Sequence, residues 1–188
     1  MNWFKNNPNY LKENKNFMSW FGSSKVVNSD GSPKVVYKGM SPHDYTKENR
    51  ETGDKGPYLE HIQRQEPFPS FDSKDSEPVH LAGFFTDKPD VAQTFAMSTG
   101  AIFPVFLSIQ NPKIFDADGK PSGKIQFGAE GKPFRDAIRS GKFDGVFILN
   151  TIDEGNVYIP LKSSQIKSAL ANKNFDAKDK RINAGLKI

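Results

Sequence analysis

An aromatic corner followed by an acidic turn is the stretch of this chain best suited to chemistry. Phe84, Phe85 and Thr86 favour an extended, half-buried backbone, and residues 87–96 have the pattern of a helix that Asp87 can cap. Where a strand meets a helix, backbone N–H groups and an aromatic face are exposed together. Such a corner suits an anionic ligand that carries a flat ring.

The composition limits what else the chain can do. It has 188 residues, no cysteine and a formal net charge of +4. One domain with a sizeable core is expected for this length. The lack of cysteine excludes disulfides, thiolate zinc sites and cysteine nucleophiles. The mild positive charge favours a phosphate-bearing ligand, but it is too small to indicate a dedicated nucleic-acid-binding protein.

Other chemical motifs are weak. His43, His61 and His80 lack the spacing of metal ligands, so we expect no metal. The glycine-rich segment 128–132 has neither the spacing nor the hydroxyl of a phosphate-binding loop, and the sequence contains no Gly-x-Ser-x-Gly elbow.

The location of the protein is predicted from its apolar runs. None approaches the ~20 residues that span a membrane, and the N-terminus lacks the apolar core of a signal peptide. We therefore expect a cytoplasmic monomer that contacts no membrane. Delivery by a phage particle would leave no such mark in the sequence.

Three parts are predicted along the chain. Residues 1–22 form a helical segment that packs on the domain, because apolar side chains recur on one face and Gly22 then ends the pattern. Residues 23–176 form the domain itself. Residues 177–188 form a basic C-terminal tail.

The domain is predicted to be α+β. Strands are expected at 34–39, 101–109, 143–149 and 157–161, and a helix at 133–140. Because it contains Pro160, the last strand is placed at a sheet edge or bulge. Residues 41–81 form a long polar excursion and residues 113–131 a loop.

Six phrases, in order, carry a family resemblance. They are residues 20–27, the strand end at 35–39, the corner at 84–86 with its helix, Asn111-Pro112 after a strand, Asp144-Gly145-Val146, and the closing phrase 165–169. Over residues 20–176 the chain resembles the ADP-ribosyltransferase domains of phage polyvalent proteins, which are related to poly(ADP-ribose) polymerases and toxins. It departs from them at Lys38 and Met40, where that family usually has His and Thr.

This resemblance implies a fold and an activity. The fold would be a split β-sheet core, in which two small, mostly antiparallel sheets surround an NAD cleft with helices at the flanks. The activity would be cleavage of the nicotinamide–ribose bond of NAD, used as a substrate, and transfer of ADP-ribose. Because its transition state resembles an oxocarbenium ion, this reaction needs orientation and charge stabilisation more than a strong base.

The resemblance also implies which residues bind NAD. Lys38 would hold a ribose hydroxyl or a phosphate, although lysine lacks the acceptor atom of histidine. Phe84 would stack on nicotinamide, while Gly39 and Thr86 would offer backbone and hydroxyl contacts. The predicted NAD-binding set is Tyr37, Lys38, Gly39, Phe84, Phe85, Thr86 and Phe95.

The acid of the family has several candidate positions here. Counting back from Gln165 places Val157 where the polymerase-like enzymes have Glu, and a shift of one residue gives Asn156. Glu154 lies two residues further back, in the loop before the last strand, and is preferred to Asp153. Gln165 is a further candidate for the catalytic set, beside Lys38 and Glu154.

The leading functional prediction is therefore an NAD-dependent mono-ADP-ribosyltransferase. It would be a phage or bacterial effector that modifies a host protein or nucleic acid. Two alternatives remain open: a catalytically degenerate relative that binds NAD, ADP-ribose or a partner protein, and a basic nucleic-acid-binding module.

Overall fold

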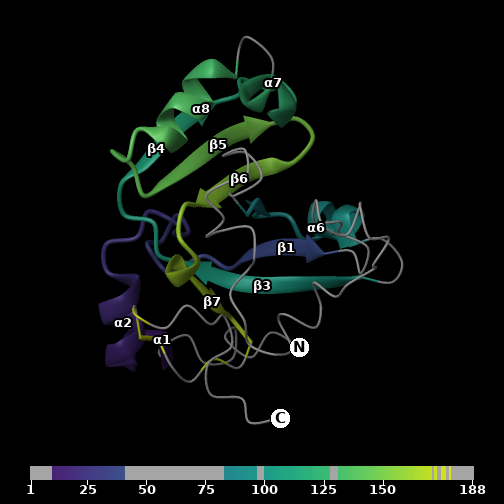
Figure 1. Ribbon diagram of the computed structural model, residues 1–188. Coiled ribbons are helices and arrows are strands. Elements are labelled where there is room, and N and C mark those ends of the chain that lie inside the picture. Colours follow the sequence, from purple (N-terminus) through teal and green to yellow (C-terminus); the bar gives the residue numbers. More distant parts are fainter. Residues whose placement is uncertain are drawn as a thin grey trace, which may run out of the picture.

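A computed structural model describes residues 10–40, 83–96, 100–127 and 131–170, together with residues 172, 175, 176 and 178 (Figure 1). The start of the helical segment, the polar excursion with its three histidines, and most of the basic tail lie outside the described residues. Within the described part, no helix is long and apolar enough to cross a membrane.

Two short helices open the described chain, α1 (Tyr10–Glu13) and α2 (Lys15–Phe21). The second begins at Asn14, whose side-chain oxygen accepts a hydrogen bond from the backbone N–H of Phe17 at 3.0 Å. It ends at Gly22, whose φ of 56° is strained for residues with a side chain. The predicted stop at Gly22 thus corresponds to a left-handed backbone.

The described strands form one mixed seven-stranded sheet. They are β1 (Val36–Met40), β2 (Phe85–Thr86), β3 (Ala101–Leu107), β4 (Pro112–Asp116), β5 (Gly145–Thr151), β6 (Gly155–Pro160) and β7 (Ile166–Ser168). Their order across the sheet is β4-β5-β6-β2-β1-β3-β7. Of these pairs, β4 and β5 run parallel and the others antiparallel.

This arrangement corrects the prediction of two separate small sheets. Strand β2 has only two residues, and it pairs with β1 through Tyr37 opposite Thr86 and with β6 through Phe85 and Thr86. It therefore joins two wings, β4–β5–β6 and β1–β3–β7, into one continuous sheet that is narrowest at β2. Figure 1 shows the two wings one above the other.

Three further helices flank the sheet: α6 (Pro89–Ala96), α7 (Ser122–Gln126) and α8 (Lys132–Arg139). Helix α6 lies directly on β1 at Gly39, where an added Cβ would stand 1.7 Å from the carbonyl oxygen of Ala92. Only a residue without a side chain allows this approach. Helix α8 instead covers the other wing, burying Phe134 against β5 and β6.

Two predictions for the second half of the domain are wrong. Residues 113–131, expected as a loop, contain most of β4 and all of α7, because a five-residue helix and a parallel strand have too little sequence periodicity to be recognised. Strand β6 is not an edge strand but lies between β5 and β2. Its Pro160 is tolerated because it is the last residue, opposite Gly145, where the ladder ends.

The core has three parts and is rich in phenylalanine. One lies between the wings and contains Phe85, Phe147 and Tyr158. A second lies under α2, where the ring of Phe17 contacts Phe106 of β3 at a centroid distance of 5.1 Å. The third lies under α8. Because each wing has its own packed layer, both can hold their side of a site rigidly.

Candidate functional site

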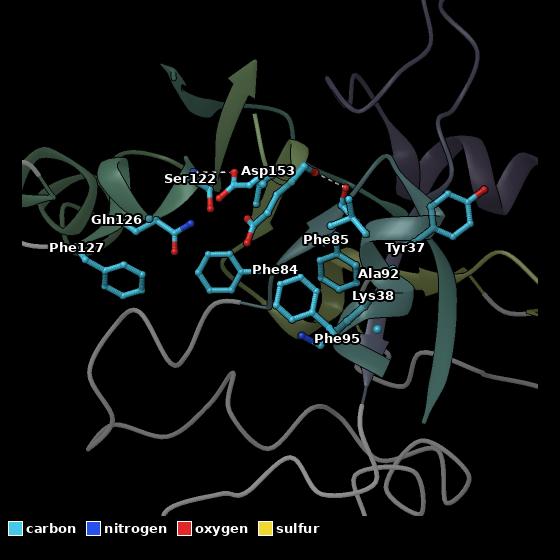
Figure 2. Close-up of a pocket in the computed structure, with 16 residues that line it drawn as sticks. Tyr37, Lys38, Phe84, Phe85, Ala92, Phe95, Ser122, Gln126, Phe127 and Asp153 are labelled. Atoms are coloured by element: carbon cyan, nitrogen blue, oxygen red, sulfur yellow. Dashed lines mark hydrogen bonds between the residues drawn. The ribbon is translucent and has the colours of Figure 1, made fainter. Parts of the chain in front are cut away.

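A cavity of about 490 Å³ lies beside the narrow middle of the sheet. Its walls come from β1, β2, α6, α7, β6 and the turn between β5 and β6 (Figure 2). The sequence-predicted residues that line it are Tyr37, Lys38, Gly39, Phe84, Phe85, Thr86, Phe95, Asp153, Glu154 and Val157. Segments from both halves of the domain therefore meet at this cavity.

The β1 side combines a close backbone approach with a cation. Gly39 lies under α6, so the strand backbone reaches the cavity with no side chain in front of it. The ammonium of Lys38 lies 5.7 Å from the centroid of the Phe85 ring, within cation–π range. The positive charge of Lys38 therefore lies against the Phe85 ring.

The aromatic corner presents its two rings differently. Phe85 is 1% exposed and belongs to the core between the wings, whereas Phe84 is half-buried. Phe95, from α6, is 54% exposed at the rim. Figure 2 shows Phe84 in the middle of the site, between the labelled residues of α6 and those of α7. Of these three rings, Phe84 is best placed to stack on a ligand.

Thr86 connects this corner to the acidic turn. Its hydroxyl donates to the backbone carbonyl of Glu154 at 2.7 Å and accepts from the backbone N–H of Lys88 at 3.1 Å. Both of these bonds hold backbone in place, and the residue is buried. Thr86 therefore fixes where Glu154 stands.

Asp87 was predicted to cap the helix that follows the corner, but its carboxylate binds Asn156 of β6 instead. Its carboxylate accepts hydrogen bonds from the backbone N–H and the side-chain amide of Asn156, at 3.1 and 2.9 Å. It also pairs with the ammonium of Lys34 at 3.6 Å. Burial lowers the pKa of Lys34, but Tyr158 and Asp87 outweigh it, so the pKa is raised. This network ties the corner to β6.

The turn between β5 and β6 is held by its own hydrogen bonds. The Thr151 hydroxyl donates to the carbonyl of Gly155 at 2.7 Å and accepts from the N–H of Glu154 at 3.0 Å. Gly155 has a φ of 71°, and a Cβ there would meet Asp87 and Lys88 at 2.9 Å. Glycine is therefore required at this turn.

Glu154 brings a carboxyl with a shifted pKa to the cavity. Burial raises the pKa of its carboxyl, a hydrogen bond from the Ser122 side chain lowers it in part, and the nearby charge of Asp153 raises it further. Asp153 is exposed and accepts the backbone N–H of Ser122 at 3.0 Å (Figure 2). A half-buried carboxyl of raised pKa, beside a second acid, is typical of a functional site.

The wall opposite α6 comes from α7, which the sequence analysis missed. Ser122 and Gln126 are 3% and 5% exposed and line the cavity, and Phe127 follows them at the rim. The local signals were a proline before Ser122 and a change from loop-like to helical residues. Neither signal indicates that this short helix faces Glu154.

Comparison with known proteins identifies the family. A family model described as the ADP-ribosyltransferase in polyvalent proteins matches residues 28–175. The chain belongs to this family. Searches of curated proteins and of solved structures find no match. The resemblance stated from the sequence is thus confirmed, and with it an α+β domain of the ADP-ribosyltransferase class.

In this ADP-ribosyltransferase domain, Val157 and Asn156 are the two alternative positions for the catalytic acid, and neither has a carboxyl. Val157 is buried in the cavity wall, opposite Thr86, and has no group that can hydrogen-bond a ribose. The side-chain amide of Asn156 donates its N–H to Asp87, and its oxygen accepts from the backbone N–H of Asn150. Among the three candidates, Glu154 is the one that brings a carboxyl to the cavity.

Gln165, the other candidate for catalysis in this transferase domain, is not among the residues that line the cavity. Its amide oxygen accepts from the N–H groups of Leu161 and Lys162, at 3.0 and 2.8 Å. Its amide nitrogen donates to the carbonyls of Ser108 and Asp144, at 2.9 and 2.8 Å. Four backbone bonds occupy this amide, so its part is to hold the chain after β6.

No cluster of metal-ligating side chains occurs within the described residues.

Proposed function

We propose that this protein is an NAD-dependent mono-ADP-ribosyltransferase that modifies a macromolecular acceptor. The observation that carries the proposal is that Lys38, Phe84 and Glu154, from three separate elements, line one cavity beside the bare backbone of Gly39. Family membership supplies the reaction class. The cavity supplies the groups that such a reaction needs.

Each group has a distinct part in this proposal. Lys38 neutralises a phosphate or donates to a ribose hydroxyl, and Phe84 stacks on the nicotinamide ring. Glu154 holds a ribose hydroxyl and places its negative charge where positive charge develops on the ribose. Because Thr86 and Thr151 fix the backbone of Glu154, little reorganisation is needed when the bond breaks.

Incubation of the protein with labelled NAD and cell lysate tests the proposal. Release of nicotinamide together with label on a macromolecule is the expected result. The variant Glu154→Gln, which keeps the shape of the side chain, is the matched control and should release nicotinamide far more slowly. A wild-type protein that neither binds NAD nor releases nicotinamide would contradict the proposal.

Val157 favours a second candidate function, a degenerate relative that binds NAD, ADP-ribose or a partner protein without transfer. Counting back from Gln165, it occupies the position where the polymerase-like enzymes have Glu, and its side chain has no polar group. Binding of NAD without nicotinamide release, at any acceptor concentration, would support this candidate.

A basic nucleic-acid-binding module, the third class, would require nucleic acid to bind equally well when the cavity is filled by NAD.

The biological setting is part of the same proposal. The family description refers to polyvalent proteins, and we infer an effector that acts on host molecules in the bacterial cytoplasm, as a monomer. Fractionation of expressing cells and measurement of the mass in solution would test both points.

A further inference from the structure

A side-chain amide of α7, that of Gln126, lines one end of the cavity. Gln126 is 5% exposed and lines the cavity, yet its side-chain amide makes no hydrogen bond within the described part of the chain. Figure 2 shows this amide pointing from α7 towards Phe84. The polar atoms of this amide are accessible from the cavity, so a ligand bound there can form hydrogen bonds with them.

The backbone under Gln126 is held firmly in place. Arg135 of α8 donates from its guanidinium to the Gln126 carbonyl at 3.3 Å. Gly131 packs against the same carbonyl so closely that a Cβ would stand 2.3 Å from it. The amide therefore projects from a rigidly held backbone, as a recognition group must.

Flat walls lie on both sides of this amide. Phe84 lies towards the sheet, and Phe127, which is 58% exposed, lies at the outer rim. An exposed phenylalanine at a cavity mouth offers a face on which a planar ring can stack. A group that stacks there and also faces Gln126 must be flat and have hydrogen-bonding atoms on its edge.

We propose that the α7 end of the cavity is the acceptor subsite and that it takes a nucleobase of single-stranded nucleic acid. Gln126 would pair with the base edge through its adjacent donor and acceptor atoms, as amides do with bases, while Phe127 stacks on one face of the base. The proposal rests on the proposed function, since it names the acceptor of that reaction.

Two acids, Asp153 and Glu154, lie beside α7 at this end of the cavity, and two exposed lysines lie near them. Lys88 and Lys124 are exposed on either side of the acidic turn, on β2–α6 and on α7, and can meet the phosphates of a strand. A single strand is required because a paired base would have to be taken out of its stack first.

The reaction at this subsite balances without any further reagent. The bond between ribose C1′ and the nicotinamide nitrogen breaks, and its electron pair leaves with neutral nicotinamide. A nitrogen of the base forms the new bond to C1′, and its proton passes to the carboxylate of Glu154. The raised pKa of Glu154 suits it to accept that proton.

The test uses labelled NAD with single-stranded homopolymers of each base, and with nuclease-treated lysate as the protein acceptor. Label on at least one homopolymer is the expected result, with less on the matching duplex. If nicotinamide is released and label appears on protein alone, the inference fails while the proposed function stands. If no nicotinamide is released with either acceptor, both fail.

Variants separate recognition from folding. Gln126→Ala should lower the ratio of base modification to NAD hydrolysis about tenfold, the scale of one lost base contact. Gln126→Glu keeps the size of the side chain but removes both donors, so it should change which homopolymer is preferred even if the alanine variant is unstable. Gln110→Ala, at an exposed position outside the cavity, is the control. An unchanged ratio and preference in both Gln126 variants would overturn the assignment.

Discussion

The two ends of the cavity differ in how their residues are brought together. At the β1–α6 end, Lys38, Gly39 and Phe84 lie within short sequence phrases that continue directly into the elements carrying them. At the α7 end, Ser122 and Gln126 meet Glu154 only because β4 and β5 pair in parallel and bring α7 over the turn. Residues of the first kind can be found from local pattern, and those of the second kind only from the fold.

The largest expected effect tests how tightly the β1–α6 end is assembled. Gly39→Ala would place a Cβ 1.7 Å from the Ala92 carbonyl, so α6 must move away from β1. We expect a loss of about 3 kcal/mol of unfolding free energy, at the upper end for overpacking, and loss of NAD binding. Thermal denaturation followed by circular dichroism measures this.

Gly123→Ala is the control for that change. A Cβ at Gly123, the second residue of α7, meets Phe127 at 3.6 Å, which is an ordinary contact. The melting temperature should hardly change. Equal destabilisation by both alanines would contradict the close-approach explanation.

The acidic turn should show the next largest effect. Glu154→Gln removes the negative charge beside the reacting ribose, so nicotinamide release should slow by about 10²-fold while NAD binding remains nearly intact. Asp153→Asn, at the neighbouring exposed acid, should slow it much less. Nicotinamide release is measured by chromatography, and the reverse order of the two variants would transfer the role to Asp153.

Lys38→Ala should weaken NAD binding rather than folding. If Lys38 meets a phosphate, its removal forfeits a charge-assisted hydrogen bond and lowers affinity about tenfold or more. Lys15→Ala, which removes an exposed lysine of α2, should leave the affinity unchanged. Calorimetric titration with NAD compares the two, and equal affinities would make Lys38 a solvent-exposed lysine without a part in binding.

The smallest expected effect is a pH-dependent gain in stability. A carboxyl whose pKa is raised by folding binds its proton more tightly in the folded state, so its ionisation opposes folding as the pH rises through the folded-state pKa. Glu154→Gln should therefore be more stable than wild type at neutral pH. The gain should vanish as the pH falls below the ordinary value of 4.5. Melting temperatures of both proteins across this range test the sign, and a variant that is less stable at neutral pH would contradict it.

The sequence indicated the residues at the first end of the cavity through the family resemblance, whose phrases include the strand end at 35–39 and the corner at 84–86. Gly39 follows a β-rich run, and Phe84 precedes a helix-forming segment. It did not predict α7, because Pro-Ser-Gly-Lys at 121–124 resembles a turn more than a helix. For a related reason it does not indicate the hydrogen bonds that Gln165 and Asp87 make. Both side chains hydrogen-bond backbone of segments that are distant along the chain, and residue type alone does not indicate such bonds.

The two-residue strand β2 also determines how the protein responds mechanically to its ligand. Because β2 alone pairs with both wings, the sheet has a natural hinge line there, with Asp87 and Asn156 as a second fastening beside it. A ligand that contacts Lys38 on one wing and Glu154 on the other spans this line and restricts the motion of the two wings relative to each other. Backbone amides of β2 and β6 should then exchange with solvent deuterium more slowly when the cavity is filled, with less change in β3 and β7.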